Sequence, residues 1–300
     1  MKKALVMGAN GYLGRHISQS LEHGGYVLST AGREANSRDG FQHYLCLDFS
    51  DADQLRQLDL DVDYIFFFAG LTGTSAGFEQ YREYVKSNDI ALLNLLSQHH
   101  LSGSRARIIF PSSRLVYRGQ KDVFLKEDAL CEPKTIYAQN KLSAEAYLRL
   151  YQNRYKNLGY SIFRICVPYG NRFDQSYPYG TIGFFLNKAR KGENIPLYGD
   201  GSQRRTFTHI DDICSLILGS LDAPGILNST FNIGGGDHCS LADAAKLVAG
   251  RFSVELEYTD WPEEDSLLES GDTMFDASKL EKITNYSYRH RLKDWLASLG

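Results

Sequence analysis

The stretch ALVMGANGYLG, residues 4–14, decides which fold this chain can adopt. Four apolar residues are typical of a buried strand, and Gly8, Gly11 and Gly14 then follow as a helical pattern begins near residue 12. Glycine permits a tight turn and lets backbone N–H groups approach a ligand, while a helix amino terminus favours negative charge. A glycine triplet alone would also fit an ordinary turn. The strand before it and the helix after it therefore carry the prediction of a pyrophosphate cradle for a dinucleotide.

Short apolar runs alternate with helical patterns along the first half of the chain. The runs lie at 4–7, 26–28, 64–68, 107–110 and 161–167, and the helical patterns near 12–24, 86–101 and 138–157. A run such as YIFFF at 64–68 is continuously apolar, which is typical of a strand buried on both faces. The order predicts an α/β fold with a doubly wound parallel sheet covered by helices on both faces.

Proline and glycine become frequent after Val167, which predicts a second, smaller lobe. We expect a first domain at 1–167 with a returning segment near 206–233, and a second lobe at 168–205 and 234–300. A ligand would lie at the carboxyl ends of the strands, where open α/β sheets bind. The sequence does not specify which ligand is bound, because that depends on loop contacts around 172–198 that no sequence rule predicts.

The composition is typical of a globular chain whose positive and negative charges are nearly balanced. Its 300 residues are 43% hydrophobic, and 36 acidic against 33 basic residues leave a formal charge of -3 with no long run of one sign. Neither a nucleic acid nor a membrane surface is therefore expected as a partner. No stretch approaches the ~20 apolar residues that span a bilayer.

The cysteines and histidines favour a reducing compartment and no metal. Five cysteines are scattered without a Cys-x-x-Cys pair, which supports neither a disulfide framework nor a zinc site. We expect a cytoplasmic protein. His99 and His100 have no partners at ligand spacing, so we interpret them as the solvated end of a helix.

The residues after the second strand bear on the choice of cofactor. An acid at this strand end would bind the ribose of NAD, whereas here Gly32 is followed by Arg33. A guanidinium can form two parallel bonds to a 2′-phosphate, which favours NADP(H). Glu34 lies close enough to keep NAD(H) possible.

Six motifs appear in order along the chain and carry a resemblance to a known family. They are GANGYLG (8–14), FFFAGLTG (66–73), PSSRLVYRG (111–119), YAQNK (137–141), YGDGSQRRTFTHIDDI (198–213) and FNIGGG (231–236). The chain resembles the extended short-chain dehydrogenase/reductases of the nucleotide-sugar epimerase/dehydratase family. The resemblance implies a Rossmann-type cofactor domain, a smaller lobe that binds a nucleoside-diphosphate sugar, hydride transfer at a sugar carbon, and a homodimer formed through helices near 86–101 and 138–157.

The resemblance also assigns site residues in this chain. The family's tyrosine, lysine and hydroxyl residue fall on Tyr137, Lys141 and Ser113. The residues expected at the cofactor are Gly8, Gly11, Tyr12, Leu13, Gly14, Arg33, Asp48, Phe49, Ala69, Gly70, Asn88 and Lys141. The residues expected at the substrate are Thr72, Pro196, Leu197, Tyr198 and Arg205. Arg205 would grip the sugar diphosphate.

The spacing of Tyr137 and Lys141 suits proton transfer. Reduction of a ketone needs a proton at the oxygen as hydride reaches the carbon, and oxidation reverses this. A tyrosine with an unperturbed pKa near 10 is a poor base. An ammonium ~4 Å away at an effective dielectric of ~20 is worth about 4 kcal/mol, which bounds the fall in the tyrosine pKa near three units. A separation of four residues places both side chains on one helical face.

Departures from the family pattern narrow the reaction. The family's 4,6-dehydratases carry an Asp-Glu pair directly after the hydroxyl residue, where this chain has Arg114 and Leu115, so dehydration is not expected. Many epimerases carry an asparagine where Val167 stands. We therefore favour a reductase of 4-keto nucleotide sugars that consumes NADPH. A 4-epimerase with tightly bound NAD is the alternative, and a non-catalytic NADP(H)-sensing protein of the same fold is a distant one.

Overall fold

The computed structural model describes residues 1–173 and 179–299, so part of the stretch 172–198 lies outside the described residues. The chain separates into two compact units. The first comprises 1–116, 133–164 and 221–231, and the second comprises 117–132, 165–220 and 232–300. Segments 117–132, 165–167, 206–220 and 232–233, which the sequence placed in the first domain, contribute to the second unit instead.

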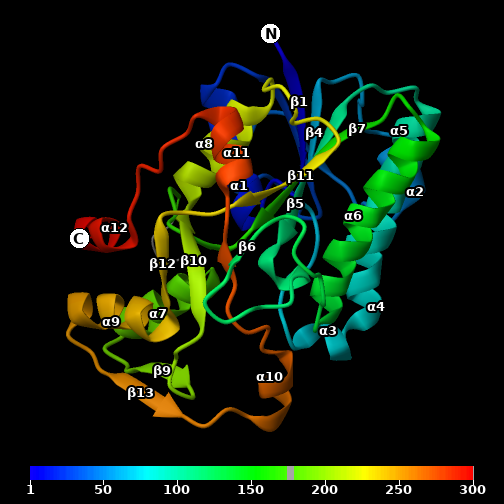
Figure 1. Cartoon of the computed structure of the whole chain (residues 1–300). Coiled ribbons are helices and arrows are strands. Elements are labelled where there is room, and N and C mark those ends of the chain that lie inside the picture. The colour runs from blue at the N-terminus through cyan, green and yellow to red at the C-terminus, as the bar shows by residue number, and fades with distance from the viewer. Residues whose placement is uncertain (174–178, 300) are drawn as a thin grey trace. The chain divides into compact units, whose positions relative to one another are not determined.

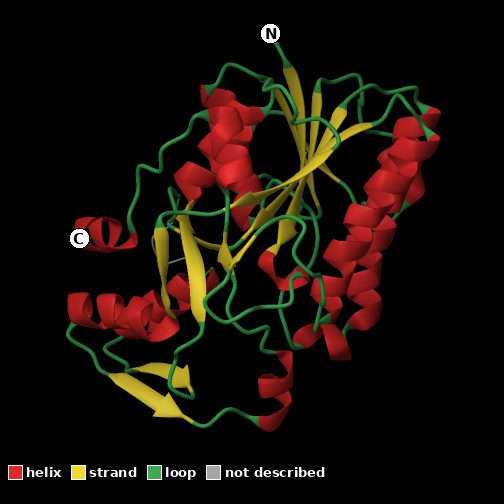
Figure 2. Ribbon diagram, in the orientation of Figure 1, coloured by secondary structure: helices red, strands yellow, loops and turns green. Residues whose placement is uncertain are grey.

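A seven-stranded sheet forms the centre of the first unit, with helices on both of its faces (Figures 1 and 2). The strand order is β11-β7-β5-β4-β1-β2-β3. The strand β1 (Lys3–Met7) pairs in parallel with both β2 (Val27–Gly32) and β4 (Tyr64–Phe67), which makes it a central strand. This arrangement is the Rossmann-type α/β fold that the sequence predicts.

The remaining elements of this sheet and its helices have the following bounds. They are α1 (Tyr12–His23), β3 (Tyr44–Cys46), α2 (Ala52–Leu55), α3 (Ala76–Glu79), α4 (Tyr81–Tyr84), the π-helical η1 (Val85–Ile90), α5 (Ala91–Leu101), β5 (Arg107–Ser113), the 3-10 helix η2 (Arg114–Val116), α6 (Ile136–Arg154), β7 (Gly159–Ile165) and β11 (Ser229–Ile233).

Alternate residues of the central strands form one face of the core. Leu5 of β1, Ile65 of β4 and Ile108 of β5 belong to one cluster and are at most 1% exposed. Leucines of α5 and α6 close over this face, and Figure 1 shows these two helices side by side, with α1 on the other face. Burial of each such side chain stabilises the fold by roughly 1.5–3 kcal/mol. Strands whose residues are apolar on both faces are therefore most stable inside the sheet.

Two differences from the predicted strands have local causes. The predicted strand at 161–167 divides at Cys166, because Val167 leaves the large sheet and pairs with Phe207 in another one. The strands β3 and β11 were not predicted. They are three and five residues long and carry exposed or half-buried positions, so their apolar signal is weak.

The second unit is built from small sheets and short helices. One sheet has the order β12-β10-β8, and two further sheets pair β13 with β9 and β14 with β6. The elements are β6 (Phe124–Leu125), β8 (Val167–Tyr169), α7 (Gly180–Arg190), β9 (Ile195–Tyr198), β10 (Arg204–His209), α8 (Ile210–Ser220), β12 (Asp237–Ser240), α9 (Leu241–Phe252), β13 (Leu256–Thr259), α10 (Glu263–Leu268), β14 (Met274–Phe275), α11 (Ser278–Thr284) and α12 (Leu292–Ser298). Across the described ranges, the helices are too short or too polar for any of them to cross a membrane.

Candidate active site

The glycine turn after β1 is closed so tightly that side chains cannot enter it. The backbone N–H of Gly8 donates to Ala31 at 2.8 Å, and that of Gly11 donates to Gly8 at 3.0 Å. A Cβ placed on Gly14 would lie 2.1 Å from the Gly8 carbonyl oxygen, and one on Gly8 would lie 2.5 Å from the Ala69 nitrogen. Gly8 also has φ +88°, which favours glycine. The turn therefore fits a dinucleotide pyrophosphate, which needs close backbone approach at the start of α1.

The two residues between these glycines begin helix α1. Gly11 is the N-cap, and Tyr12 is the first helical residue and is 6% exposed. Leu13 is half-buried. Their predicted contact with the cofactor would be made from the helix amino terminus, whose dipole favours an anion.

The Tyr44 side chain packs closely against position 32 at the end of β2. A Cβ on Gly32 would lie 2.7 Å from the hydroxyl of Tyr44, and this hydroxyl donates to the Glu34 carbonyl at 2.9 Å. Arg33 is exposed. The carboxylate of Glu34 instead accepts a bond of 3.0 Å from Asn10 in the glycine turn and forms an ion pair with Arg38. Hydrogen bonds from Arg38 lower the pKa of Glu34.

Asp48 and Phe49, both predicted at the cofactor, lie on one short turn. Phe49 is 4% exposed and packs into the core. Asp48 accepts a bond of 2.6 Å from the Ser50 hydroxyl and pairs with Lys86 at 3.2 Å. Burial acts to raise the pKa of Asp48, but these partners lower it overall, so the group is anionic at neutral pH.

A single asparagine anchors the loop after β4. The Asn88 side chain accepts from the Leu71 nitrogen at 2.8 Å and donates to the Leu71 carbonyl at 3.2 Å. This residue lies in the π-helical segment η1, a rare geometry that is frequent at functional sites. The loop it anchors contains Gly70, whose φ is +138°, and the exposed Thr72, whose carbonyl accepts from Tyr84 at 2.7 Å. Asn88 thus fixes the backbone of the loop that contains Gly70 and Thr72, where the cofactor is predicted to bind.

The proposed proton-transfer residues lie where α6 packs on the end of β5. The ammonium nitrogen of Lys141 is 5.8 Å from the Tyr137 ring centroid and donates to the Pro111 carbonyl at 2.7 Å. Ser113, two residues further along β5, is 9% exposed, and its hydroxyl oxygen accepts from the Leu115 nitrogen at 3.2 Å. Lys141 is buried, with 8% of its surface exposed, and this burial lowers its pKa from 10.5 to about 7. The structure therefore brings Tyr137 and Lys141 together beside the strand end that carries Ser113.

Two buried polar residues next to Asn88 and Lys141 in the chain were not predicted from the sequence, Asp89 and Asn140. The carboxyl of Asp89 on η1 is bonded to the amide of Asn140, and that amide's oxygen accepts from Asn88 at 3.3 Å. Burial raises the pKa of Asp89. The position of Asn140 beside Lys141 was the available sequence signal.

The predicted substrate residues at 196–205 lie in the second unit. Pro196, Leu197 and Tyr198 belong to β9, where Tyr198 is 42% exposed and its ring centroid is 5.0 Å from that of Trp261. Arg205 is 1% exposed, pairs with Glu269 at 2.5 Å and donates to the Gly271 carbonyl at 2.6 Å. Its charge is therefore already balanced by a carboxylate, which the sequence did not indicate.

One group of histidine and aspartate side chains in the second unit has the residue types of a metal site. His209, Asp211 and His290 bring possible ligand atoms within 4.8 Å of one another. The two imidazole rings, however, stack at 4.2 Å with planes 23° apart, so their lone pairs run alongside one another. Asp211 also forms an ion pair with Arg172. We assign no metal role to this group.

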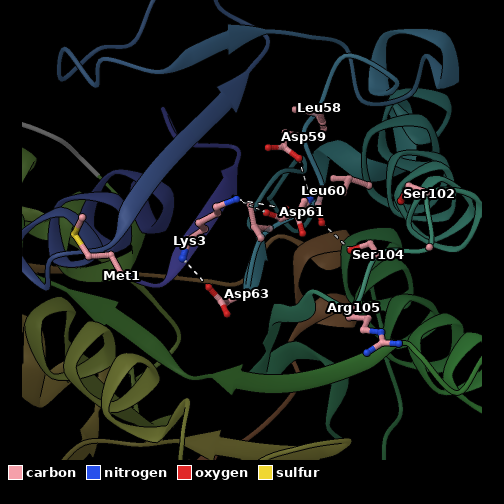
Figure 3. A pocket seen from close by; sticks show the side chains of 12 residues that line it. Met1, Lys3, Leu58, Asp59, Leu60, Asp61, Asp63, Ser102, Ser104 and Arg105 are labelled. Carbon is pink, nitrogen blue, oxygen red and sulfur yellow. Dashed lines mark hydrogen bonds and ion pairs between the residues drawn. The ribbon is translucent and has the colours of Figure 1, made fainter.

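A cavity of about 710 Å³ lies at the other end of the strands of the large sheet (Figure 3). Its lining includes Lys3, where β1 begins, and the loops that precede β4 and β5. Lys3 is tied there to Asp61 and Asp63. Because the glycine turn follows the carboxyl end of β1 and Ser113 is the last residue of β5, this cavity is separate from the candidate active site.

Comparisons with known proteins agree with this geometry. A sequence model of the NAD dependent epimerase/dehydratase family matches residues 4–234. A UDP-glucuronate 4-epimerase of Thermodesulfobacterium geofontis is 25% identical over 94% of this chain and 90% of its own length. The solved UDP-glucose 4-epimerase of Thermotoga maritima with UDP-glucose has a TM-score of 0.87 at 23% identity, covering 98% of this chain and 96% of that one.

A further solved structure bears on the cofactor. The UDP-glucuronic acid 4-epimerase of Bacillus cereus, in complex with UDP-glucuronic acid and NAD, has a TM-score of 0.82 at 22% identity and covers 99% of this chain and 97% of that one. The preference for NADP(H) that Arg33 predicted gains no support from these proteins. The match of the family model over most of the chain shows that it belongs to the NAD-dependent epimerase/dehydratase family, whose members are enzymes of the extended short-chain dehydrogenase/reductase type.

Proposed function

We propose that the chain is a nucleotide-sugar 4-epimerase that keeps NAD bound and inverts the C4 hydroxyl of a UDP-sugar. The observation that carries this proposal is the buried Lys141 beside Tyr137 at the end of β5. The relatives named as 4-epimerases support this reading over the 4-keto reduction that the sequence favoured.

The residues would act as follows on a sugar bound with C4 facing Tyr137. The phenolic oxygen of Tyr137 takes the proton of the C4 hydroxyl as hydride leaves C4, and returns it when hydride comes back on the opposite face. When bound, a nicotinamide cofactor supplies the acceptor and then the donor of that hydride. Lys141 as ammonium stabilises the tyrosinate through its charge.

The remaining groups position the sugar oxygen and the cofactor. The Ser113 oxygen accepts from the Leu115 nitrogen, which leaves its hydroxyl hydrogen available for the C4 oxygen. Gly8, Gly11 and Gly14 would hold the pyrophosphate, and Lys141 can reach the adjoining ribose from the same face as Tyr137. Arg205 and Pro196–Tyr198 remain predicted contacts to the nucleoside diphosphate.

The test is interconversion of C4 epimers without added cofactor. Purified protein is incubated with UDP-glucose, UDP-glucuronate or UDP-N-acetylglucosamine, and the anomeric proton signals are followed by NMR. We expect one pair to reach equilibrium and Tyr137→Phe to lower the rate by about 10²–10⁴-fold, because the proton-transfer group is lost. Tyr151→Phe on the same helix is the matched control and should keep full activity. Absence of interconversion with every sugar would overturn the proposal.

A second candidate is the NADPH-dependent reduction of a 4-keto sugar, because the end of β2 has a specific geometry. The strand ends in Gly32, against which the Tyr44 hydroxyl packs, and the exposed Arg33 follows directly after it. Such a strand end suits a 2′-phosphate better than a free ribose hydroxyl. Loss of NADPH absorbance with a 4-keto-6-deoxy nucleotide sugar, without epimer interconversion, would favour this candidate.

A further inference from the structure

A buried carboxylate lies one helical turn beyond Lys141. Glu145 of α6 is 0% exposed, and Arg164 of β7 binds it with two bonds, from Nε to Oε1 at 2.9 Å and from Nη2 to Oε2 at 2.7 Å. Arg149, also on α6, donates to Oε2 at 2.8 Å. A bidentate guanidinium fixes both the position and the plane of a carboxylate, so Glu145 is held rigidly.

Three consecutive residues at the end of β5 connect this carboxylate to the proposed active site. The Pro111 carbonyl accepts from Lys141, the Ser112 hydroxyl donates to Glu145 Oε1 at 2.6 Å, and Ser113 is the proposed hydroxyl partner of the substrate. Two side chains of α6, four residues apart, therefore grip two successive residues of β5. These contacts fix how α6 and the strand end lie against each other.

We propose that Glu145 is a positioning residue for the Tyr137/Lys141 pair, because its carboxylate, oriented by Arg164, holds Ser112 and so aligns the strand end of Ser113 with helix α6. The inference rests on the proposed function, since it assigns Glu145 a role through those catalytic groups. The proton transfer proposed above assigns no role to a carboxylate at this position.

The bonds that join Glu145 to Ser112 and Arg164 form a clamp on helix α6. The negative charge of Glu145 has a second effect, because it acts on the pKa of Lys141. Burial acts to raise the pKa of this carboxyl, but hydrogen bonds and charge from Arg164 lower it below its usual value, so Glu145 is an anion at neutral pH. This anion raises the pKa of Lys141 against the lowering by burial. Tyr137 and Glu145 on α6 act on Lys141 directly, Arg149 on α6 and Arg164 on β7 pair with Glu145, and Asp89 on η1 is bonded to Asn140, the chain neighbour of Lys141. Removal of the Glu145 charge should therefore leave less Lys141 as ammonium.

Two substitutions separate the charge of Glu145 from its geometry. Glu145→Gln keeps the length but removes the charge, so the Lys141 titration should move to lower pH by about one unit. Glu145→Asp keeps the charge but is one methylene shorter, so the titration should stay within half of that shift while kcat falls about tenfold as the contact to Ser112 is lost. Lys141 is observed directly in ¹³C,¹⁵N-lysine-labelled protein by NMR, and its signal is assigned by its absence from Lys141→Arg.

Ser112→Ala tests the clamp without disturbing any charge. It removes only the hydroxyl bond to Glu145, and we expect kcat to fall about tenfold with KM unchanged. Ser161→Ala is the matched control, because Ser161 on β7 is also buried and donates one bond of 2.9 Å, to the Ile226 carbonyl, away from α6. A similar loss of stability in both variants with a fall in kcat only in Ser112→Ala supports the proposal.

The outcomes distinguish this inference from the proposed function. An unchanged Lys141 titration in folded Glu145→Gln overturns the inference, and so does an equal kcat for Ser112→Ala and Ser161→Ala. If Glu145→Gln does not fold, the serine pair decides. If wild-type protein converts none of the UDP-sugars, the proposed function fails, whereas the NMR titration needs no substrate and still decides whether Glu145 controls Lys141.

Discussion

Replacement of Lys141 by methionine should abolish activity and yet stabilise the protein at neutral and acidic pH. Lys141 is buried, and its ammonium donates a hydrogen bond of 2.7 Å to the Pro111 carbonyl. Burial in low dielectric disfavours the charged form, which is why its pKa falls to about 7. Methionine has nearly the same length, fits beside Phe110 and carries no charge.

The magnitude follows from the difference in pKa between the folded and unfolded states. A fall from 10.5 to about 7, at about 1.36 kcal/mol per pH unit, corresponds to about 5 kcal/mol. Loss of the bond to Pro111 offsets about 1 kcal/mol of this. We therefore expect Lys141→Met to raise the free energy of unfolding by about 4 kcal/mol at pH 6.

The stability difference between Lys141→Met and wild type should depend on pH in a definite direction. The unfolded chain holds the lysine proton up to pH 10.5, whereas the folded protein releases it near pH 7, so the unfolded state binds more protons between these values. Wild-type stability must then rise with pH across this window relative to the variant. The advantage of Lys141→Met is complete below pH 7 and disappears by about pH 10.5.

Urea titrations at pH 6, 7.5 and 9.5 measure this difference. Both tryptophans, Trp261 and Trp295, lie in the second unit, so their fluorescence reports that unit while far-UV circular dichroism reports both. Lys246→Met is the control, because the Lys246 side chain is 63% exposed and its removal should give no pH-dependent difference. If Lys141→Met and wild type keep a constant difference across the three pH values, the reasoning is refuted.

Three further substitutions test other parts of the site. Gly14→Ala should eliminate NAD binding, measured by cofactor content after purification, because its Cβ would lie 2.1 Å from the Gly8 carbonyl; Gly250→Ala in α9 meets nothing within 4 Å and should instead stabilise by about 1 kcal/mol. Glu269→Gln should cost roughly 1–3 kcal/mol and tighten UDP binding in calorimetry by freeing the charge of Arg205, and an unchanged affinity would assign Arg205 a structural role only. Leu150→Arg on α6, at a leucine 63% exposed, should convert the expected homodimer to a monomer in sedimentation velocity, whereas Leu267→Arg on α10, at a leucine 70% exposed, should not.

The parts of the fold that the sequence predicted are those whose signal is local. The strand β1 and the glycine turn follow from eleven adjacent residues, and Tyr137 and Lys141 share a face because four residues make about one helical turn. The interpretation of His99 as solvated was wrong, since it is 0% exposed and its Nε2 lies 2.9 Å from the Ala106 carbonyl. Its neighbour His100 is exposed, so a helix end can bury one of two adjacent histidines, and only the packing decides which.

The sequence alone did not predict contacts between distant segments. The partner of Arg205 is Glu269, 64 residues further along the chain, and no spacing rule connects them. Glu145 could have been noticed, because it lies four residues after Lys141 on the predicted helix. Its importance depends on Ser112 and Arg164, which approach it from two different strands of the sheet.

A comparison of Lys141 with the other buried cations indicates that this lysine serves function rather than stability. Within 1–173 and 179–299, the lysine and arginine side chains in the buried class are Lys141, Arg164 and Arg205. Arg164 pairs with Glu145 and Arg205 with Glu269, whereas Lys141 has no carboxylate within 4.0 Å in this part of the chain. A buried charge without a counter-ion costs several kcal/mol, and a methionine would avoid that cost. A lysine kept there at the expense of stability is what a site needs when its ammonium must face a tyrosine and a bound ligand.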